Sequence, residues 1–229
     1  VGIVTSIDGV AAVEPRLESK TTVILRKDGR PVVGLGLTER PMGANFPTVP
    51  ELSPYRFVGK GSAPTTESEV VLDHRAAEIA DVAVGDSVTI AGKLGVRQFT
   101  VTGIVEMTHG ELPDGSTLAL FATDVARPLF ELGPDDNAIA IKVADDVDVA
   151  TVADRIRAVI GGGAVVSTGD EYAEHRHAAL AKSFTLIRAL LVGFAGLALV
   201  VGAFTVANSM SLLFDRRRRG FAMLRLMGA

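Results

Sequence analysis

The sequence predicts an α+β domain over residues 1–168, followed by one long helix that runs into and across a membrane. Up to residue 168, strand-like and helix-like stretches alternate without the regular rhythm of a parallel α/β fold. From Ala189 to Phe214 there is no ionisable residue, and about 20 such residues in a helix cross a bilayer core. Arg216–Arg219 follow directly, and arginines beside a span favour the cytoplasmic side.

The distribution of charge agrees with this orientation. Residues 1–182 carry 17 Lys and Arg against 26 Asp and Glu, whereas residues 183–229 carry 6 against 1. An acidic domain joined through an apolar span to a basic tail predicts a domain outside the cell and a tail inside it. The domain has no basic patch in its sequence, which argues against a nucleic-acid partner. The absence of cysteine excludes a disulfide framework and a thiolate metal site.

In the first third of the chain, the pattern predicts a strand at 10–16 and a β-hairpin. The hairpin joins strands at 21–26 and 31–37, because Asp28-Gly29 between two strand-like runs is a strong turn signal. The proline-rich stretch 38–68 reads as a long surface connection with little regular structure. Such a loop is either functional or simply irregular packing.

The rest of the domain alternates between short strands and amphipathic helices. Further strands are expected at 69–72, 87–91, 96–106, 117–121, 137–143 and 164–167. Helices are expected at 73–80 with Asp73 as N-cap, at 123–130 with Thr123 as N-cap, and at 148–160 with Val149, Val152, Ile156 and Val159 on one face.

The C-terminal helix is expected to begin at Asp170, with Thr168 or Asp170 as its cap, and to continue without a break. Residues 169–183 are polar and amphipathic, which predicts a stalk; residues 184–214 are apolar, which predicts a transmembrane helix. The basic segment 215–229 then lies in the cytoplasm. The alternative is a buried core helix of a soluble domain, but such helices are usually shorter and amphipathic.

Small residues four apart within the span indicate close helix packing. The pairs are Ala189 with Gly193, Ala198 with Gly202, and Ala203 with Ala207. Such pairs let helices approach closely in lipid, so we expect contact with other transmembrane helices of the same protein or of a dimer mate. The alternative is that small residues are merely scattered through an alanine-rich chain.

The chain lacks the sequence marks of a catalytic site. No G-x-x-x-x-G-K-[ST] loop is present, so ATP hydrolysis would belong to another chain. His175 and His177 lie two apart, a spacing that directs helical side chains away from each other, and a solvated stalk face explains them better than a metal site. There is no G-x-S-x-G elbow. We therefore expect no catalytic residues, no metal, no cofactor and no enzyme activity.

The tail from Asn208 to Ala229, NSMSLLFDRRRRGFAMLRLMGA, resembles a known segment. It is similar to the stretch after the second span of FtsX-like, MacB-type ABC transporter permeases, whose pattern ends R-R-R-E-[IF]-A-L-L-R-x-[LI]-G-A. Four upstream stretches are similar to the MacB-like periplasmic core of that family: Gly61–Pro64, Glu69–Asp73, Val84–Asp86 and Phe99–Val105. The resemblance covers roughly residues 69–229, and Gly220 departs from it where the family usually has Glu.

The resemblance implies that the tail is a cytoplasmic coupling segment that contacts an ABC ATPase subunit. The residues that it places at this contact are Arg217, Arg218, Arg219, Phe221, Leu224 and Arg225. The spacing of Phe221, Leu224 and Met227 gives a short apolar face beside a basic one, which agrees with this expectation. The alternative is that the arginines only anchor the chain to anionic lipid headgroups.

The function implied is that of a permease-subunit fragment. It would couple ATP hydrolysis by a partner ATPase to work on an extracytoplasmic lipid, lipoprotein, peptide or drug, by mechanotransmission through the helix. The alternative is a membrane-anchored binding or sensory module that regulates a cell-envelope partner such as a cell-wall hydrolase. A membrane-anchored enzyme would need a polar cluster in a pocket of residues 1–168.

The expected setting is the cell membrane, with residues 1–183 outside and residues 215–229 in the cytoplasm. Because the chain begins at Val1 without a signal-like stretch, we expect further spans in the full-length protein. The expected partners are the ATPase subunit, other transmembrane helices and the lipid bilayer.

Overall fold

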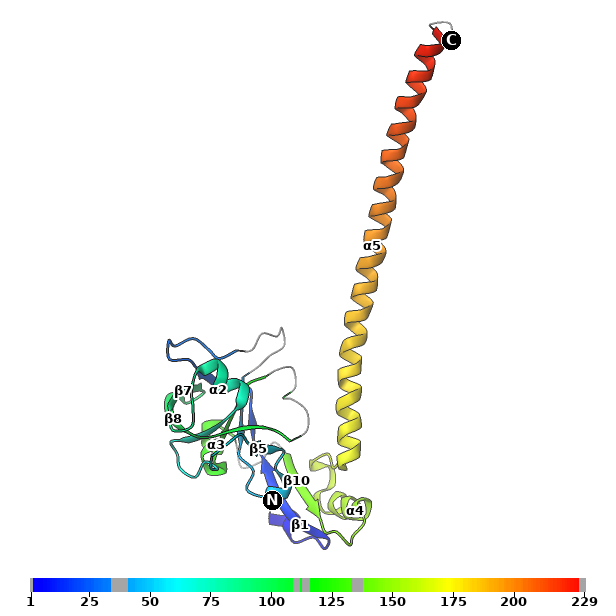
Figure 1. Cartoon of the computed structure of the whole chain (residues 1–229). Helices are drawn as coiled ribbons and strands as arrows, with labels where there is room; N and C mark the ends of the chain where they lie inside the picture. The colour runs from blue at the N-terminus through cyan, green and yellow to red at the C-terminus, as the bar shows by residue number, and fades with distance from the viewer. Residues whose placement is uncertain (1, 34–40, 109–111, 113–115, 133–137, 227–229) are drawn as a thin grey trace. The chain divides into compact units, whose positions relative to one another are not determined.

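The structure, a computed structural model, describes residues 2–33, 41–108, 112, 116–132 and 138–226, except for the side chains of 175–187, 189 and 212–226. Its contacts divide the chain into two compact units, Val1–Val166 and Ser167–Ala229. In Figure 1 the first unit consists of strands with short helices, and the second is dominated by one helix.

Within the described residues, the larger sheet of the first unit has eight strands. They are β2 (Glu18–Ser19), β3 (Val23–Leu25), β4 (Met42–Asn45), β5 (Tyr55–Phe57), β6 (Glu69–Asp73), β7 (Ser87–Gly92), β8 (Gly95–Met107) and β9 (Leu118–Phe121). Their order is β2-β4-β9-β6-β8-β7-β3, and β5 pairs with β8 off this path. The pairs β4–β9 and β6–β8 are parallel and the others antiparallel, so the sheet is mixed.

The hairpin of β7 and β8 follows the period-two pattern of the sequence. Val88 and Ile90 are buried on one face, and Gly92 pairs with Gly95 across the turn. Gly95 has a φ of +100°, a conformation that favours glycine. Further along, an irregularity between Val70 and Val71 leaves one extra residue in β8, and such a bulge reverses which face the following side chains occupy.

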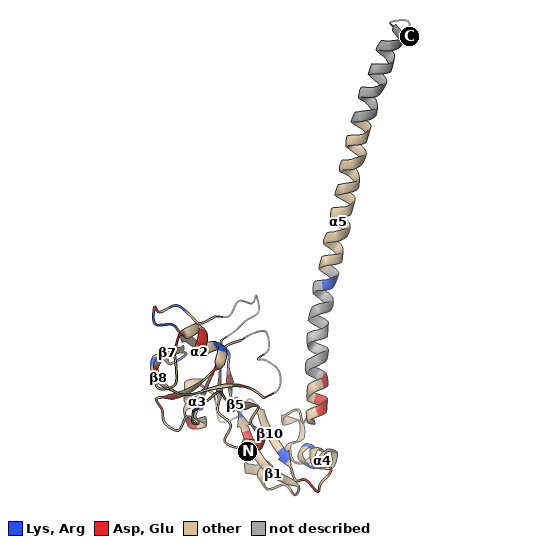
Figure 2. Cartoon of the chain, in the orientation of Figure 1, with Lys and Arg blue, Asp and Glu red and all other residues tan. Residues whose placement is uncertain are grey.

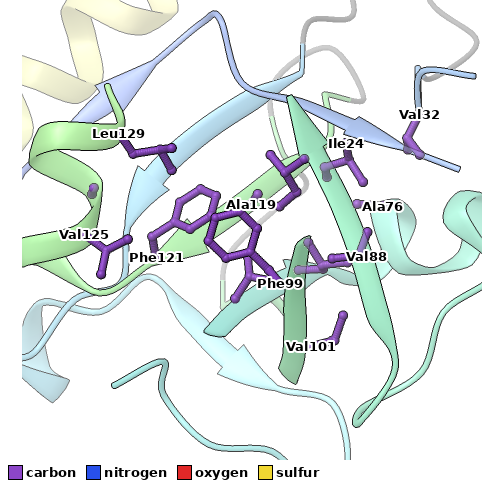
Figure 3. Close-up of a cluster of buried hydrophobic side chains, with 14 of the residues drawn as sticks. Ile24, Val32, Ala76, Val88, Phe99, Val101, Ala119, Phe121, Val125 and Leu129 are labelled. Atoms are coloured by element: carbon purple, nitrogen blue, oxygen red, sulfur yellow. The ribbon is translucent and has the colours of Figure 1, made fainter. Parts of the chain in front are cut away.

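One face of the large sheet is covered by two helices, α2 (His74–Ala80) and α3 (Thr123–Leu129). Figure 3 shows the cluster beneath them, with the rings of Phe99 and Phe121 side by side and Val125 and Leu129 reaching in from α3. The centroids of Phe99 and Phe121 are 5.1 Å apart, in an edge-to-face arrangement. Aromatic pairs of this geometry are worth about 0.5–1.5 kcal/mol beyond the area that they bury.

The opposite face of the sheet carries a second, smaller cluster. Its buried members are Ala44, Val71, Val105, Leu118 and Leu120. Half-buried side chains cover them, namely Met42, Phe46, Tyr55, Phe57 and Leu112. No residue of a described helix belongs to this cluster, so aromatic side chains rather than a helix form the outer layer of this face.

A second sheet pairs β1 (Val10–Arg16) with β10 (Ala138–Val143) in antiparallel register. It packs with α1 (Gly2–Thr5) and α4 (Val149–Ile160) around Val4, Val152 and Ile156, and the short 3₁₀ turn η3 (Gly161–Gly163) follows α4. The Asp148 carboxylate accepts a 2.9 Å hydrogen bond from the Thr151 N–H and caps α4. Of the predicted apolar face of α4, however, Val149 and Val159 are exposed.

Two buried polar side chains join the two sheets. The Glu14 carboxylate of β1 accepts hydrogen bonds from the N–H groups of Thr48 and Val49, at 3.0 and 2.9 Å. Asn45, at the end of β4, accepts from the Leu17 N–H at 2.8 Å and donates to the Pro15 carbonyl at 2.9 Å. Buried hydrogen bonds of this kind fix the exit of β1 against the loop after β4.

The structure corrects three details of the expected elements. The stretch 38–68, expected to have little regular structure, contains β4, β5 and the 3₁₀ turn η1 (Pro50–Leu52). Residues 164–167 form no strand. Thr123 does not cap α3, because the N-cap is Ala122, and the Thr123 hydroxyl accepts a bond from the Asn45 amide instead. Of the predicted strand 31–37, the structure describes only residues 31–33. Within them, Pro31 forms a single bridge with Leu25.

Candidate functional site

The second unit is the helix α5 (Gly169–Leu226), which has 58 residues. Its start is fixed by a capping box. The Thr168 hydroxyl accepts from the Glu171 N–H at 3.2 Å, while the Glu171 carboxylate accepts from the Thr168 N–H at 2.8 Å. This reciprocal arrangement satisfies two N–H groups that a helix start otherwise leaves without partners. Of the two predicted caps, the structure selects Thr168.

The central part of α5, Leu190–Ser211, is long and apolar enough to cross a membrane. Its 22 residues have a mean hydropathy of 2.4, and at about 1.5 Å per residue they span about 33 Å. A bilayer core is about 30 Å thick. Length and composition therefore match one crossing, as the sequence predicts.

Apolar side chains surround this part of the helix on all sides. Leu191, Phe194, Leu199 and Phe204 are each more than 60% exposed, and none of the apolar window is buried within the chain. A core helix of a soluble domain would bury such residues. Large exposed apolar surface needs a cover of lipid or of other helices.

Charged side chains end where the apolar stretch begins. Figure 2 shows acidic residues at the start of α5 and, further along, a described stretch without charge. In the sequence, Arg188 comes just before this stretch. Arg188 stands next to the span, where a long cationic side chain can reach the headgroup region.

The predicted helix-packing residues lie on two different sides of α5. Ala198 comes nine residues, or two and a half turns, after Ala189. The pair Ala189 and Gly193 therefore lies on the opposite side of the helix from the pair Ala198 and Gly202. Gly193, Ala198 and Gly202 are exposed, and a Cβ placed on Gly193 or Gly202 would meet no atom within 4 Å. The side chain of Ala189 lies outside the description. Packing by these residues stays a prediction.

The predicted ATPase-coupling residues belong to the last part of the same helix. The α5 backbone continues from the apolar span through Leu226. It therefore includes Arg217, Arg218, Arg219, Phe221, Leu224 and Arg225, whose side chains the structure does not describe. Their role in coupling stays a prediction.

The first unit holds a cavity of about 390 Å³ with both polar and apolar lining, which sequence reasoning missed. Tyr55 from β5, Asp73 and Glu78 from the N-cap and middle of α2, and Glu106 from β8 line it, and nothing in the sequence around these three stretches signals that they meet. Burial is the main cause that raises the pKa of Tyr55 to about 12. Burial also raises the pKa of Asp73, against the lowering effect of its backbone hydrogen bonds.

The Asp73 carboxylate has a structural role within this cavity. One oxygen accepts from the Ala76 N–H at 3.0 Å and caps α2, as predicted. The other accepts from the Leu118 N–H at 2.5 Å, at the start of β9. Both oxygens are thus engaged by backbone donors. Across the described residues, no group of three or more His, Asp or Glu is placed to hold a metal ion.

Comparison with known proteins places the first unit in a family. The family model of the MacB-like periplasmic core domain matches residues 2–159, more than half of the chain. An uncharacterized ABC transporter permease of Methanocaldococcus jannaschii is 27% identical over 154 residues, which cover 65% of this chain and 36% of the relative. The chain thus spans about a third of the length of that relative.

Solved structures give weaker likenesses. The periplasmic region of MacB from Actinobacillus actinomycetemcomitans has 18% identity and a TM-score of 0.46, with 70% of this chain and 72% of the other covered. A domain of a permease protein from Porphyromonas gingivalis has 16% identity and a TM-score of 0.49, with 69% and 73% covered. The extracellular domain of the transporter YknZ from Gram-positive bacteria has 12% identity and a TM-score of 0.47, with 69% and 79% covered.

The chain thus combines a mixed-sheet domain that matches a periplasmic family with a long apolar helix that could cross a membrane. The chain belongs to the family of the MacB-like periplasmic core domain and is a homologue of ABC transporter permeases. The resemblance stated from the sequence is therefore confirmed at the level of family and fold.

Proposed function

We propose that this chain is the part of an ABC transporter permease that carries motion from a partner ATPase to the extracytoplasmic side. ATP binding and hydrolysis by the partner would move the basic segment 215–229. The helix would transmit that motion across the bilayer to the domain 1–168. The work would be done on a lipid, lipoprotein, peptide or drug outside the membrane.

The observation that supports this proposal is the continuity of α5. One helix includes the stalk, the apolar span and the arginine-rich segment without interruption from Gly169 to Leu226. A helix keeps its length because every residue along it is held by the i→i−4 hydrogen bonds of the backbone. Motion at one end therefore reaches the other end, whereas a flexible linker would absorb it.

A flexible insert in the stalk tests this mechanism. Gly-Gly-Ser-Gly after Ala181 breaks the helix, whereas Ala-Ala-Lys-Ala at the same place adds the same length as helix. We expect a non-hydrolysable ATP analogue to change hydrogen–deuterium exchange in residues 1–166 of the wild type and of the helical insert. In the glycine insert the change should disappear while ATPase activity remains. The measurement uses the full-length permease with its ATPase in nanodiscs.

If the glycine insert keeps the wild-type response, rigid transmission through α5 is wrong. If none of the three proteins responds to nucleotide although the ATPase is bound, the domain acts as a binding or sensory module instead. The helical insert has the same number of residues as the glycine insert, so it controls for the added length. Its four residues rotate the helix by about 400°, close to one full turn, so the side chains beyond it keep nearly the same direction.

A further inference from the structure

A groove of about 900 Å³ lies on the first unit, between the aromatic side chains of the smaller cluster and the first turns of α3. Three aromatic and three proline residues line it: Phe46, Tyr55, Phe57, Pro47, Pro50 and Pro64. A groove of this size falls in the range of ligand-binding sites. Its aromatic residues are half-buried, so their rings are partly accessible.

The aromatic floor of the groove is held in place before any ligand binds. The rings of Phe46 and Phe57 stack, with centroids 5.7 Å apart and an angle of 24° between their planes. Phe57 lies against two glycines. A Cβ on Gly61 would come within 2.9 Å of the Phe57 ring, and a Cβ on Gly103 within 2.5 Å. Only residues without a side chain leave room for the ring here, and a fixed ring loses little entropy on binding.

Main-chain groups of β5 offer hydrogen bonds beside this floor. Among the described residues, β5 pairs with β8 alone, so its other edge has no strand. The bonds Val58 N–H to the Ile104 carbonyl and Thr108 N–H to the Pro54 carbonyl alternate along the pair. In an antiparallel ladder, this spacing turns Arg56 toward β8 and directs the N–H and C=O of Phe57 to the open edge.

The rim of the groove is polar but carries little charge. Hydroxyl side chains at Thr48, Ser53, Thr65 and Thr123 line it, and the charged lining residues are Asp124 and Arg127. This contrasts with the acidic composition of the domain as a whole. A strongly charged ligand would find no matching cluster of opposite charge among these residues.

We propose that this groove binds an extended, uncharged, proline-containing segment of a partner protein. The segment would hydrogen-bond to the open edge at Phe57 and lay its apolar side chains on the rings of Phe46 and Phe57. Extended peptides are recognised in this way, by main-chain bonds at a strand edge and by aromatic grooves. The backbone donor and acceptor directed to the open edge favour a peptide over an acyl chain, which offers no hydrogen bonds. This proposal does not depend on transmission through α5.

Selection from a random dodecamer peptide library displayed on phage tests the proposal, with the full chain in nanodiscs as target and no ATPase present. We expect enriched peptides with prolines, aliphatic residues and no net charge. Their dissociation constants, measured by fluorescence anisotropy, should rise at least tenfold in Gly103→Ala, where Phe57 must move. Gly163→Ala should bind as the wild type does, because a Cβ there meets open space.

A second variant does not touch the core. Ala63→Asp places a charge in the exposed lining of the groove and should also weaken binding at least tenfold, whereas Ser62→Asp beside it should not. The proposal is overturned if no peptide is enriched, if the enriched peptides share charged residues, or if Ala63→Asp binds them like the wild type. It is also overturned if Ala63→Asp changes the oligomeric state of the chain, because the groove would then join copies of it.

Discussion

Two carboxylates inside the first unit act on backbone donors. Glu14 is fully buried, and one of its oxygens accepts three bonds from Thr48 and Val49. Its other oxygen has no hydrogen-bond partner among the described residues. Asp73 divides its two oxygens between α2 and β9. In both cases the carboxylate accepts hydrogen bonds from backbone N–H groups that would otherwise lack a partner near the start of a helix or strand.

The raised pKa of Asp73 predicts a specific dependence of stability on pH. Because burial raises this pKa above its ordinary 3.8, the folded state binds a proton more tightly than the unfolded state. The contribution of Asp73 to the free energy of unfolding therefore falls as pH rises from 3.8 toward the raised value. Asp73→Asn cannot titrate and loses one acceptor, so it should be less stable by about 1–2 kcal/mol, and the deficit should shrink between pH 4 and pH 7.

Urea unfolding followed by tyrosine fluorescence measures this difference, since the chain has two Tyr and no Trp. Asp81→Asn, at the exposed C-terminal end of α2, controls for the chemistry of the substitution. A deficit for Asp73→Asn that stays constant or grows with pH would contradict the assignment.

At the scale of elements, the helices and strands with strong local sequence signals were predicted well, whereas a strand that depends on tertiary pairing was not. Asp73 and the alternation around Val88 gave α2 and β7 with nearly their observed bounds. Strand β4, MGAN, has no β-branched residue and exists because β9 and β2 pair with it, so no local preference announces it. Thr123 looks like a cap in sequence, but a distant residue, Asn45, uses its hydroxyl.

The candidate site divides in the same way. Composition alone indicates the apolar span of α5, because the hydropathy of its 22 residues depends on their own side chains and not on tertiary contacts. The cavity at Asp73 and the groove at Phe57 combine residues far apart in the chain. Glycines 61 and 103 matter only because both meet the same ring, a relation that one sequence does not reveal.

The last turns of α5 allow a test that separates ATPase contact from lipid anchoring. Changing Arg217, Arg218 and Phe221 together to Ala should abolish co-purification of the ATPase with the full-length permease and its stimulated activity. Arg217→Lys with Arg218→Lys keeps the charge but loses the planar guanidinium, which recognises carboxylates in a way that ammonium does not. A lipid anchor needs only the charge.

We therefore expect the double lysine variant to lose at least part of the ATPase stimulation while it remains in the membrane. Wild-type ATPase stimulation in the alanine variant would show that the arginines only anchor the chain. Membrane flotation of both variants reports whether insertion itself has failed.

On the scale of the whole molecule, the sequence joins an acidic domain to a basic end through an apolar span without charge. Residues 2–159 belong to a family of periplasmic core domains, and the apolar part of α5 is long enough to cross a membrane. The cytoplasmic position of residues 215–229 is a prediction from the arginines, which rarely cross toward the outside.

The absence of cysteine makes the orientation directly measurable. Leu94→Cys lies at the tip of the β7–β8 hairpin, where the side chain is 53% exposed, and Ala222→Cys lies in the segment 215–229. A membrane-impermeant maleimide should label the first in spheroplasts and the second only after lysis. Labelling of Ala222→Cys in sealed spheroplasts would reverse the proposed topology.

The capping box at Thr168 fixes where α5 begins, and an unbroken helix then fixes direction as well as distance. Each residue rotates the helix by about 100°. The direction in which every later side chain points around the helix axis is therefore set by its distance in sequence from Thr168. Adding or removing one residue in the stalk would barely change the length of the helix. It would, however, rotate the arginines by about a quarter-turn around the helix axis. A chain that works by pushing would tolerate that change, whereas one that works by twisting would not.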